Sequence, residues 1–597
     1  MEKLKIPPER ILAITFTKMA ALEMRSRAGA LLGEKAAALS IFTFHSFFYR
    51  ILKSRYRFSP EQIITLNKQL LILADAGKKT RIELTDDSKA LQELLNEISR
   101  YKCLPGDRRK AFKSRSFLSN RDFICLAEDY MRRMKDLRLF DFDDLMLFCD
   151  TLFDREPEEL LKWHNSYSFY MVDEFQDIDP LQCSLLKRLS APEYNVFAVG
   201  DDDQSIYSFR GASPELMLKF EDSFPGAKRM FLSVNFRSGA EIVEAAGKVI
   251  AQNKNRIEKS IRTPEEKAGG SDNGKEKESG SRGETGEERS AVERREFKTD
   301  REEREWIAER LKSDVEKAGR SAVIFRTNRL AGSFASECAR KEVPFRCRER
   351  LNDIYDHFVA RDILDYCALA DGERLRSILF RIMNHPFRGI SRSAVPGDSF
   401  SFEALKDYHR SEPRALSAIK RLERDVSIMG AMQPYTAIHY ILNGMGYLRY
   451  LKMRAKGKEA EAEEWGAIAF EVMERSKGYR GFKEYFEAVK EYSENIAMAG
   501  KKRYSEETGK EGAVTILTYH ASKGLEFDEV YLPCLSEGII PERRADDPAA
   551  IEEERRLFYV GMTRARKKLY LSCAEEIQGR EALRSRFWGE GGPRSGG

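Results

Sequence analysis

The sequence predicts an α/β fold with parallel sheets and two mainly helical insertions. Short apolar runs, rich in β-branched and aromatic residues, have the length of buried strands, and helical stretches lie between them. The runs are ILAITFT (11–17), FYMVDE (169–174), VFAVGDDD (196–203), AVIFRT (322–327), VTILTYH (514–520) and EVYLPC (529–534). Alternation of strand and helix is typical of parallel sheets, which bind ligands at the carboxyl ends of their strands. The acidic and polar residues of these runs stand at those ends.

Two long stretches, roughly 55–160 and 350–505, contain no such run. They are charged, and most of their apolar residues fall at helical spacing, as in DYMRRMKDLRLFDFDDLMLF. We expect each stretch to be a helical insertion within an α/β domain. A third stretch, 262–290, has almost no large apolar side chain and many Gly, Ser, Glu and Lys residues, which predicts a disordered insertion.

Length and composition set outer bounds on the protein. A chain of 597 residues is too long for one hydrophobic core and should form several domains. The 102 Lys and Arg residues exceed the 97 Asp and Glu residues by five, so the net charge by itself indicates no polyanionic partner. The nine cysteines form no CxxC pair, and the sequence has neither an apolar signal core nor a run of about 18 apolar residues. We therefore expect a cytoplasmic protein with reduced thiols and no membrane partner.

Acidic residues follow two of the predicted strands. Asp173 and Glu174, within DEFQD, end one of them; Asp173 could hold Mg²⁺ bound to nucleotide phosphates while Glu174 polarises the attacking water. An acidic pair after a strand is more often structural, but the full string DEFQD followed by a proline and a helix is more specific. The next strand leads into Gln204, which could sense a γ-phosphate, and into Tyr207 and Phe209, on which bases could stack. The same rings could equally be core residues that need no ligand.

Seven strings occur in a fixed order along the chain. They are ILAITFTKMAALEMRSR (11–27), IFTFHSFFYRIL (41–52), DEFQD (173–177), GDDDQSIYSFRGA (200–212), FLSVNFRS (231–238), VTILTYHASKGLEFDEVYLPCLSEGIIP (514–541) and EEERRLFYVGMTRARKKLYL (552–571). Together they resemble motifs Ia, Ib, II, III, IV, V and VI of the UvrD/Rep/PcrA family of superfamily 1 DNA helicases. The resemblance extends over nearly the whole chain.

The resemblance implies two RecA-like parallel-sheet domains of the P-loop NTPase type, which clamp ATP between them. The first would be incomplete at its N-terminus, and each would contain one of the mainly helical insertions. The predicted segments are, in chain order, 1–54 and 161–225 for the first RecA-like domain, 55–160 for its helical insertion, 226–344 and 509–588 for the second RecA-like domain, 345–508 for its helical insertion, and 589–597 for a flexible tail.

The resemblance also assigns roles around ATP and Mg²⁺, the implied cofactors. Asp173 would hold Mg²⁺, Glu174 would activate water and Gln204 would sense the γ-phosphate. The second domain would supply Arg237 and Arg564 as arginine fingers, Phe236 stacked on adenine, Glu526 bonded to the ribose, and Gly524 in the same string. Either arginine by itself could be an ordinary surface or salt-bridged residue.

A further group of residues matches the family's contacts with single-stranded DNA; they are Thr15, Phe16, Thr17, Thr43, Phe44, His45, Tyr207, Phe209 and Arg210. Hydroxyls and backbone amides at strand ends can hold phosphates, while aromatic rings stack on bases of any sequence. His520 matches a residue that couples the DNA site to the ATP site. Phe209 stands where the family usually has Trp; Phe still stacks, with a smaller face. The implied partners are single-stranded DNA and single/double-strand junctions, while repair or replication partners stay unassigned.

One motif of the family has no match in this sequence. The family has a strand and a GxxxxGK[ST] loop before motif Ia, whereas here motif Ia begins at Ile11 and that pattern occurs nowhere in the 597 residues. The loop would supply a lysine for the β and γ phosphates, backbone amides around them and a hydroxyl for Mg²⁺. We therefore expect impaired ATP hydrolysis by this chain, and a gap in the centre of the first sheet with exposed apolar surface. A truncated chain or a gene start placed too late, a second polypeptide that supplies the unit, and a degenerate gene product stay open as explanations.

Two functions stay open from the sequence. The first is an ATP-dependent DNA helicase that moves 3′ to 5′ on a single strand, with the polarity implied by the resemblance alone. The alternative is a non-catalytic relative that binds single-stranded DNA or regulates another protein. The first is favoured because a protein with no use for ATP has no physical reason to keep Asp173, Glu174, Gln204, Arg237, Glu526 and Arg564.

Overall fold

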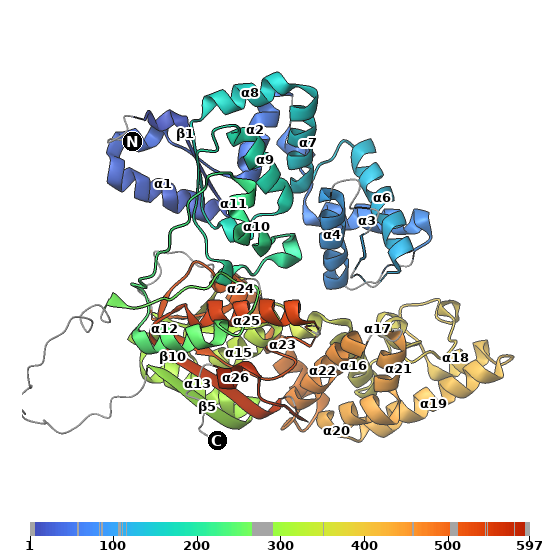
Figure 1. Ribbon diagram of the computed structural model, residues 1–597. Helices are drawn as coiled ribbons and strands as arrows, with labels where there is room; N and C mark the ends of the chain where they lie inside the picture. The colour runs from blue at the N-terminus through green and yellow to red at the C-terminus, as the bar shows by residue number, and fades with distance from the viewer. Residues whose placement is uncertain are drawn as a thin grey trace, which may run out of the picture. The chain divides into compact units, whose positions relative to one another are not determined.

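The computed structural model describes residues 6–56, 59–82, 84, 88–104, 109, 112–114, 116, 118–264, 291–349, 351–455, 459–501, 512–543, 545, 547–577 and 579–590. The chain divides into two compact units: unit 1 comprises Met1–Phe231 and Asn255–Lys259, and unit 2 comprises Leu232–Lys254 and Ser260–Gly597. Each unit contains its own mainly parallel sheet with helices around it (Figure 1), so the predicted fold class is confirmed.

Two of the predicted segments fall largely outside the described residues. Of the disordered insertion expected at 262–290, only residues 262–264 are described. Of the flexible tail expected at 589–597, Gly589 and Glu590 close helix α26 (Phe587–Glu590), and residues 591–597 are not described.

Unit 1 is built on a four-stranded parallel sheet with the order β2-β1-β3-β4. Its strands are β1 (Ile11–Thr15), β2 (Ser40–Thr43), β3 (Phe169–Val172) and β4 (Val196–Ala198). In register, Ile14 of β1 pairs with Val172 of β3, which pairs in turn with Ala198 of β4. The described strands pair without interruption, so the expectation of a gap in the centre of this sheet is wrong. The reason is that β1 pairs directly with β3, which leaves β4 as an edge strand.

The helices of unit 1 form two groups. Those that accompany the sheet are α1 (Lys18–Leu32), α2 (Phe44–Arg55), α7 (Phe142–Arg155), α8 (Pro157–Ser166), α9 (Pro180–Ser190), α10 (Pro214–Leu218) and α11 (Phe220–Ser223). The others, which lie between α2 and α7 in the chain, are α3 (Leu66–Thr80), α4 (Ser88–Cys103) and α6 (Asn120–Asp136). This second group has its own hydrophobic core around Leu73, Leu94 and Phe123. This group lies within the stretch 55–160, where the sequence predicted a helical insertion, whereas α7, in the same stretch, packs with the sheet; the bounds of the insertion stay a prediction.

The two faces of the first sheet are covered differently. On one face, side chains such as Tyr170 join a core that includes residues of α2, α7, α8 and α9. On the other face, Ala13 packs against Ala21 of α1. Beyond α1 on that face, Met171 of β3 and Phe197 of β4 pair in register and are 41% and 55% exposed. Apolar surface is therefore exposed, as the sequence analysis expected, but at the β4 end of the sheet.

Unit 2 contains a seven-stranded sheet in which β11-β10-β9-β6-β8-β7 lie in this order and β5 also pairs with β10. The strands are β5 (Val292–Thr299), β6 (Ser321–Phe325), β7 (Phe345–Cys347), β8 (Val514–Thr518), β9 (Phe527–Leu532), β10 (Ala565–Ile577) and β11 (Arg580–Glu581). β6 and β8 are buried along their whole length. Such burial is typical of central strands in a parallel sheet that is covered on both faces.

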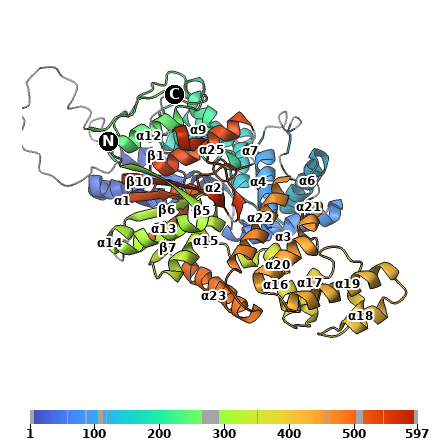
Figure 2. The same ribbon diagram turned by 90° about the horizontal axis from the view of Figure 1, so that it is seen from below.

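The helices of unit 2 also form two groups. Those near the sheet are α12 (Ala240–Ile250), α13 (Asp300–Ser313), α14 (Val315–Ala318), α15 (Asn328–Arg340), α24 (Tyr519–Ser522) and α25 (Pro548–Met562). Between β7 and β8 the chain forms α16 (Phe358–Ala370), α17 (Arg376–Ile382), α18 (Phe402–Tyr408), α19 (Pro413–Gly430), α20 (Pro434–His439), α21 (Tyr447–Arg454), α22 (Glu459–Arg475) and α23 (Phe482–Lys501). Helices α16 to α21 lie to one side of the sheet (Figure 2). Among the described helices, none combines the length and the apolar character that crossing a membrane requires.

Candidate functional site

Two adjacent carboxylates lie at the carboxyl end of β3. The N–H of Asp173 donates to the carbonyl of Ile14 at 2.9 Å, which ties this residue to β1. Glu174 has a φ of 54°, in the left-handed region that residues with a side chain seldom adopt, and backbone strain of this kind occurs at active sites as well as in turns. Both side chains are partly buried. Oxygen ligands at a strand end suit Mg²⁺, so the residues present fit a magnesium-bound phosphate, and Asp173 is the one that would hold the ion.

Gln176, which is not among the predicted site residues, connects these carboxylates to the next strand. This side chain is fully buried, its Nε2 donates to Oε2 of Glu174, and its Oε1 accepts the N–H of Asp201 at 3.1 Å. A Cβ on Gly200 would come within 2.5 Å of that Oε1. Glycine at position 200 therefore leaves the space that the Gln176 amide occupies. The only signal in the sequence was the place of Gln176 within DEFQD.

Three consecutive aspartates precede Gln204. The first, Asp201, accepts a hydrogen bond from Nε2 of Gln204 at 2.7 Å, and the two that follow it are buried. Lys259 contacts all three carboxylates, and Arg256 forms a bidentate pair with the third. Burial acts to raise the pKa of Asp201, but Lys259, with hydrogen bonds from Gln204 and the N–H of Asp203, holds that pKa below its usual value. Because an ammonium group already lies among the carboxylates, we assign no metal ion to this cluster.

Aromatic rings on both sides of this loop form a candidate surface for bases. Tyr207 stacks on Phe16, with ring centroids 5.3 Å apart and ring planes 20° apart. Phe209 lies 6.0 Å from Tyr207 and is 43% exposed. The structure thus brings together three of the residues predicted to contact DNA, from two distant motifs. The side chain of Arg210, predicted at the same surface, lies outside the described residues.

The three threonines predicted at the DNA site differ in their surroundings. Thr17 is the N-cap of α1, and its Oγ1 accepts the N–H of the third residue of that helix at 3.1 Å. Thr43 caps α2 in the same way at 3.3 Å. Helix N-termini attract anions, so both positions suit a phosphate. Thr15 is fully buried, and its hydroxyl is among the buried polar atoms without a hydrogen-bond partner.

Phe44 and His45 begin α2 and face different surroundings. The ring of Phe44 belongs to the hydrophobic core of unit 1, so only its backbone could face a DNA strand. The ring of His45 packs edge-on against Phe142, with centroids 5.3 Å apart, and the side chain is partly buried. Their contacts with DNA stay predictions.

In unit 2, residues predicted at the nucleotide site lie together. The Nε of Arg237 donates to Oε2 of Glu526 at 2.8 Å, and Arg566 lies 3.5 Å from the other oxygen of that carboxylate. Phe236, next to Arg237 in the chain, is 84% exposed, which suits a ring that stacks on a planar base. Gly524 has a φ of 80°, a conformation open to glycine that turns the chain ahead of Glu526.

Arg564 is buried within unit 2. The side chain is 1% exposed, its Nε donates to the carbonyl of Val560 at 2.8 Å, and its Nη1 donates to the carbonyl of Leu525 at 3.2 Å. Its Nη2 donates to Oγ1 of Thr563 at 3.0 Å. To reach a phosphate, the guanidinium would have to exchange these partners, so its role as an arginine finger stays a prediction.

His520 lies on the short helix α24, directly after β8. Thr518 caps this helix and also donates a hydrogen bond to Glu349 at 2.6 Å. Tyr519 packs against Gly561 of α25 so closely that a Cβ at that glycine would lie 2.3 Å from the ring. Helix α24 is therefore in tight contact with α25, which precedes Arg564. The coupling role of His520 stays a prediction.

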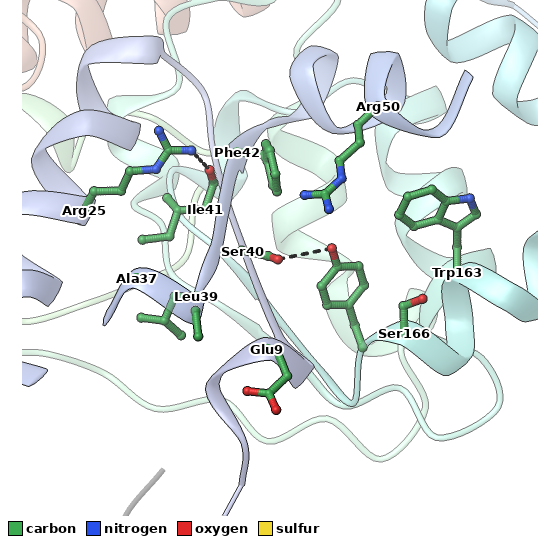
Figure 3. A pocket seen from close by; sticks show the side chains of 12 residues that line it. Glu9, Arg25, Ala37, Leu39, Ser40, Ile41, Phe42, Arg50, Trp163 and Ser166 are labelled. Atoms are coloured by element: carbon green, nitrogen blue, oxygen red, sulfur yellow. Dashed lines mark hydrogen bonds between the residues drawn. The ribbon is translucent and has the colours of Figure 1, made fainter. Parts of the chain in front are cut away.

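A cavity of about 510 Å³ lies at the outer edge of β2. There Phe42 lies between Arg25 and Arg50, whose guanidinium carbons are 6.0 and 5.3 Å from the ring centre (Figure 3). The hydroxyl of Tyr167 donates to Ser40 at 3.2 Å. No residue predicted to contact ATP or DNA lines this cavity, and we assign it no role.

Two family models together match most of the chain. A UvrD/REP helicase N-terminal domain matches residues 1–225, and a UvrD-like helicase C-terminal domain matches residues 230–400 and 458–576. The chain is 30% identical to a putative ATP-dependent DNA helicase, YjcD, of Bacillus subtilis, over 98% of this chain and 76% of the relative. It is also 30% identical to a probable DNA helicase II homolog of Rickettsia felis, over 95% of this chain and 86% of the relative. The ATP-dependent DNA helicase PcrA of Bacillus subtilis shows 30% identity over 96% of this chain and 78% of its own length.

Proposed function

This chain belongs to the UvrD/REP family of DNA helicases, and from that premise we propose that it forms a motor that moves 3′ to 5′ along single-stranded DNA. Its DNA partners are single strands and single/double-strand junctions, and it is driven by hydrolysis of ATP in the presence of Mg²⁺. One observation carries the proposal: the loop after β4 is tied to Glu174 through Gln176 at one end, and its other end supplies Tyr207, stacked on Phe16. A single short loop thus joins the candidate nucleotide groups to the candidate DNA surface.

Each of these side chains has a part in the proposed cycle. Asp173 would hold the magnesium ion, which would neutralise phosphate charge when bound. Glu174 orients the attacking water and accepts its proton. Gln204 faces the γ-phosphate, so loss of that phosphate changes the forces on Gln204. Because Tyr207 follows three residues later, the change reaches the ring on which a base stacks.

We further propose that the 597-residue chain by itself hydrolyses ATP weakly. The sequence contains no GxxxxGK[ST] pattern, whose lysine and backbone amides hold the β and γ phosphates. The exposed Met171 and Phe197 beside the acidic strand ends support the proposal, because that part of the sheet lacks a cover among the described residues. Water in this region would compete with every charged contact to the nucleotide.

Binding and hydrolysis by the purified chain test both proposals. Fluorescence anisotropy with a labelled oligonucleotide should show binding that is sensitive to salt and tolerant of sequence. Phosphate release should stay close to its DNA-free rate when single-stranded DNA is added. Absence of DNA binding would overturn the proposed motor function. Strong stimulation of phosphate release by DNA would overturn the proposal that this chain hydrolyses ATP weakly.

The aromatic surface can be tested in the same binding assay. Tyr207→Ala should weaken binding about tenfold or more, the loss that follows removal of one stacked base. Tyr408→Ala is the matched control, because Tyr408 is an exposed tyrosine on α18 and no predicted site contains it. Equal affinities of the two variants for DNA would show that the aromatic surface around Tyr207 does not bind DNA.

A non-catalytic single-strand binder is the second candidate, and the missing phosphate-binding pattern favours it. The two candidates differ in their residual phosphate release. In a motor this release falls when Glu174 is replaced by Gln, because the carboxylate activates water. In a binder it equals the background and Glu174→Gln leaves it unchanged.

A further inference from the structure

The segment Asn255–Lys259 has an unusual place in the fold. The chain leaves unit 1 after Phe231, continues in unit 2 through α12, contributes these five residues to unit 1, and then returns to unit 2. The segment contains no helix or strand. Its attachment to unit 1 therefore depends on its side chains and on hydrogen bonds of its backbone.

Three of its groups contact the aspartates that precede Gln204. The ammonium of Lys259 lies 2.6 Å from Asp202 and 3.3 Å from Asp203, and it also contacts Asp201. The guanidinium of Arg256 donates to both oxygens of Asp203, at 2.9 and 2.7 Å. The N–H of Ile257 donates to Asp202 at 2.7 Å.

These contacts are shielded from water. The side chains of Arg256 and Lys259 are 12% and 14% exposed, and those of Asp202 and Asp203 are 2% and 0% exposed. Shielded ion pairs are weakly screened by salt, and removal of one partner leaves an uncompensated buried charge. These ion pairs therefore fix the position of the aspartates more strongly than surface salt bridges would.

The same aspartates hold the groups on which the proposed function depends. Asp201 accepts from Gln204 at 2.7 Å, and its own N–H donates to Gln176, which donates to Glu174. Downstream of Gln204, the chain reaches Tyr207, whose ring stacks on Phe16. Displacement of the aspartates would therefore move the candidate nucleotide groups and the candidate DNA surface together.

We propose that Lys259 and Arg256 are positioning residues that hold the loop 201–207. Through these two side chains, the segment 255–259, which connects two parts of unit 2, supports both the candidate nucleotide groups and the candidate DNA surface. Neither side chain needs to touch ATP or DNA for this role. The inference rests on the proposed function, because it takes Tyr207 as a DNA contact and Gln204 as a nucleotide contact.

The test compares Lys259→Ala with Lys254→Ala. Lys254 is an exposed lysine five positions earlier, and its side chain is not part of the aspartate cluster, so its replacement controls for loss of one positive charge. We expect Lys259→Ala to weaken single-strand binding about tenfold, as when one stacked base is lost, and Lys254→Ala to have little effect. Amide hydrogen exchange of residues 199–207 should become faster in Lys259→Ala and stay as in the wild type in Lys254→Ala.

The salt dependence of binding separates positioning from direct contact. A positioning residue lowers the affinity and leaves the slope of log affinity against log salt unchanged. A lysine that contacts a DNA phosphate lowers the magnitude of that slope by about 0.7 when it is removed. A changed slope, or an unchanged affinity with unchanged exchange, would therefore overturn the inference.

A milder variant keeps the test decisive if Lys259→Ala does not fold. Arg256→Lys retains the charge and loses the bidentate geometry, so binding should weaken in the same direction by about threefold, with faster exchange at 199–207. Wild-type affinity and exchange in this variant would count against the inference. If the wild-type chain fails to bind DNA, the proposed function fails, and the exchange measurement still decides whether the segment holds the loop.

Discussion

The two sheets of this protein differ in how completely they are covered. In unit 2 the central strands β6 and β8 are buried along their whole length, and Phe325 of β6 is 1% exposed. In unit 1 the edge strand β4 leaves Phe197 55% exposed, beside Met171 at 41%. The same residue type is therefore core in one sheet and surface in the other. In unit 1, the acidic candidate residues therefore follow strands whose β4 end is covered on one face only by the described residues.

Truncation of one phenylalanine in each sheet tests this difference in burial most directly. Phe325→Ala should lower the free energy of unfolding of unit 2 by about 3–5 kcal/mol, because it removes a buried ring and leaves a cavity. Phe197→Ala should change the stability of unit 1 by less than about 1 kcal/mol, as expected at an exposed position. Urea denaturation, followed by amide exchange in each unit, measures both values. Similar losses in the two variants would show that Phe197 is buried in solution.

A second test supplies a cover for the first sheet. A strand, a GxxxxGK[ST] loop and a helix, fused ahead of residue 6, should raise ATP hydrolysis at least about 100-fold, because preorganised donors then hold the phosphates. The matched control is the same fusion with the loop lysine replaced by alanine. It should slow amide exchange in β3 and β4 without raising hydrolysis. If the fusion with the intact loop slowed amide exchange in β3 and β4 but did not raise ATP hydrolysis, the proposed reason for weak hydrolysis would be contradicted.

A third test compares a crowded glycine with an uncrowded one in unit 2. Gly561→Ala should destabilise the unit by about 1–3 kcal/mol, because the new Cβ would lie 2.3 Å from the ring of Tyr519. Gly247→Ala, in α12, meets no atom within 4 Å and should stabilise the unit by about 0.5–1 kcal/mol through helix propensity. Thermal unfolding of the two variants should therefore move in opposite directions. A shift of the same sign in both would refute the tight packing of α24 on α25.

Two shielded carboxylates, one in each unit, have pKa values shifted in opposite directions. Asp179 caps α9 in unit 1, and burial raises its pKa to about 6 although backbone N–H groups oppose the shift. Glu471 in unit 2 is buried, but Arg475, Arg329 and a hydrogen bond from Ser333 together outweigh burial and lower its pKa to about 2. The folded protein binds a proton at Asp179 more tightly than the unfolded chain does, and at Glu471 less tightly. The two groups therefore give stability opposite dependences on pH.

The smallest predicted effect follows from Asp179. Its ordinary pKa is 3.8 and its folded pKa about 6, so this group makes unit 1 less stable as pH rises from about 4 to about 6. Asp179→Asn keeps the cap and removes the charge, and it should stabilise unit 1 by about 1 kcal/mol at pH 7, since some access to water reduces the full shift. Unfolding free energies of both proteins between pH 4 and pH 7 give the comparison. Parallel curves over this range would exclude the effect.

Strands that are apolar along their length could be predicted from the sequence, and others could not. β6 and β8 consist of buried residues throughout, so their apolar runs indicated them directly. β10 escaped because Arg566, Lys567 and Lys568 interrupt it, and β5, VERREFKT, escaped because it is mostly charged. Both strands form because they pair with neighbours: β10 lies between β9 and β5. Because such neighbouring strands are remote in the sequence, a local sequence pattern does not reveal them.

The candidate site divides in the same way. Motif order alone predicted Asp173, Glu174, Gln204, Tyr207 and the unit 2 residues around Glu526 as site residues, because each motif is a short string that carries its own chemical groups. Gln176, Arg256 and Lys259 acquired their places only in the folded chain, where Arg256 meets an aspartate 53 positions away. Burial of Arg564 was likewise invisible in its motif.

By itself, then, the amino-acid order determined which chemical groups this protein possesses, the α/β alternation that presents them at strand ends, and the absence of one phosphate-binding pattern. Only the folded chain shows which charges neutralise one another, which apolar side chains of the first sheet are exposed, and which side chains contact the three aspartates before Gln204. The physical reason is one of range: helix and strand preferences act over a few neighbouring residues, whereas ion pairing and burial depend on segments that only folding brings into contact.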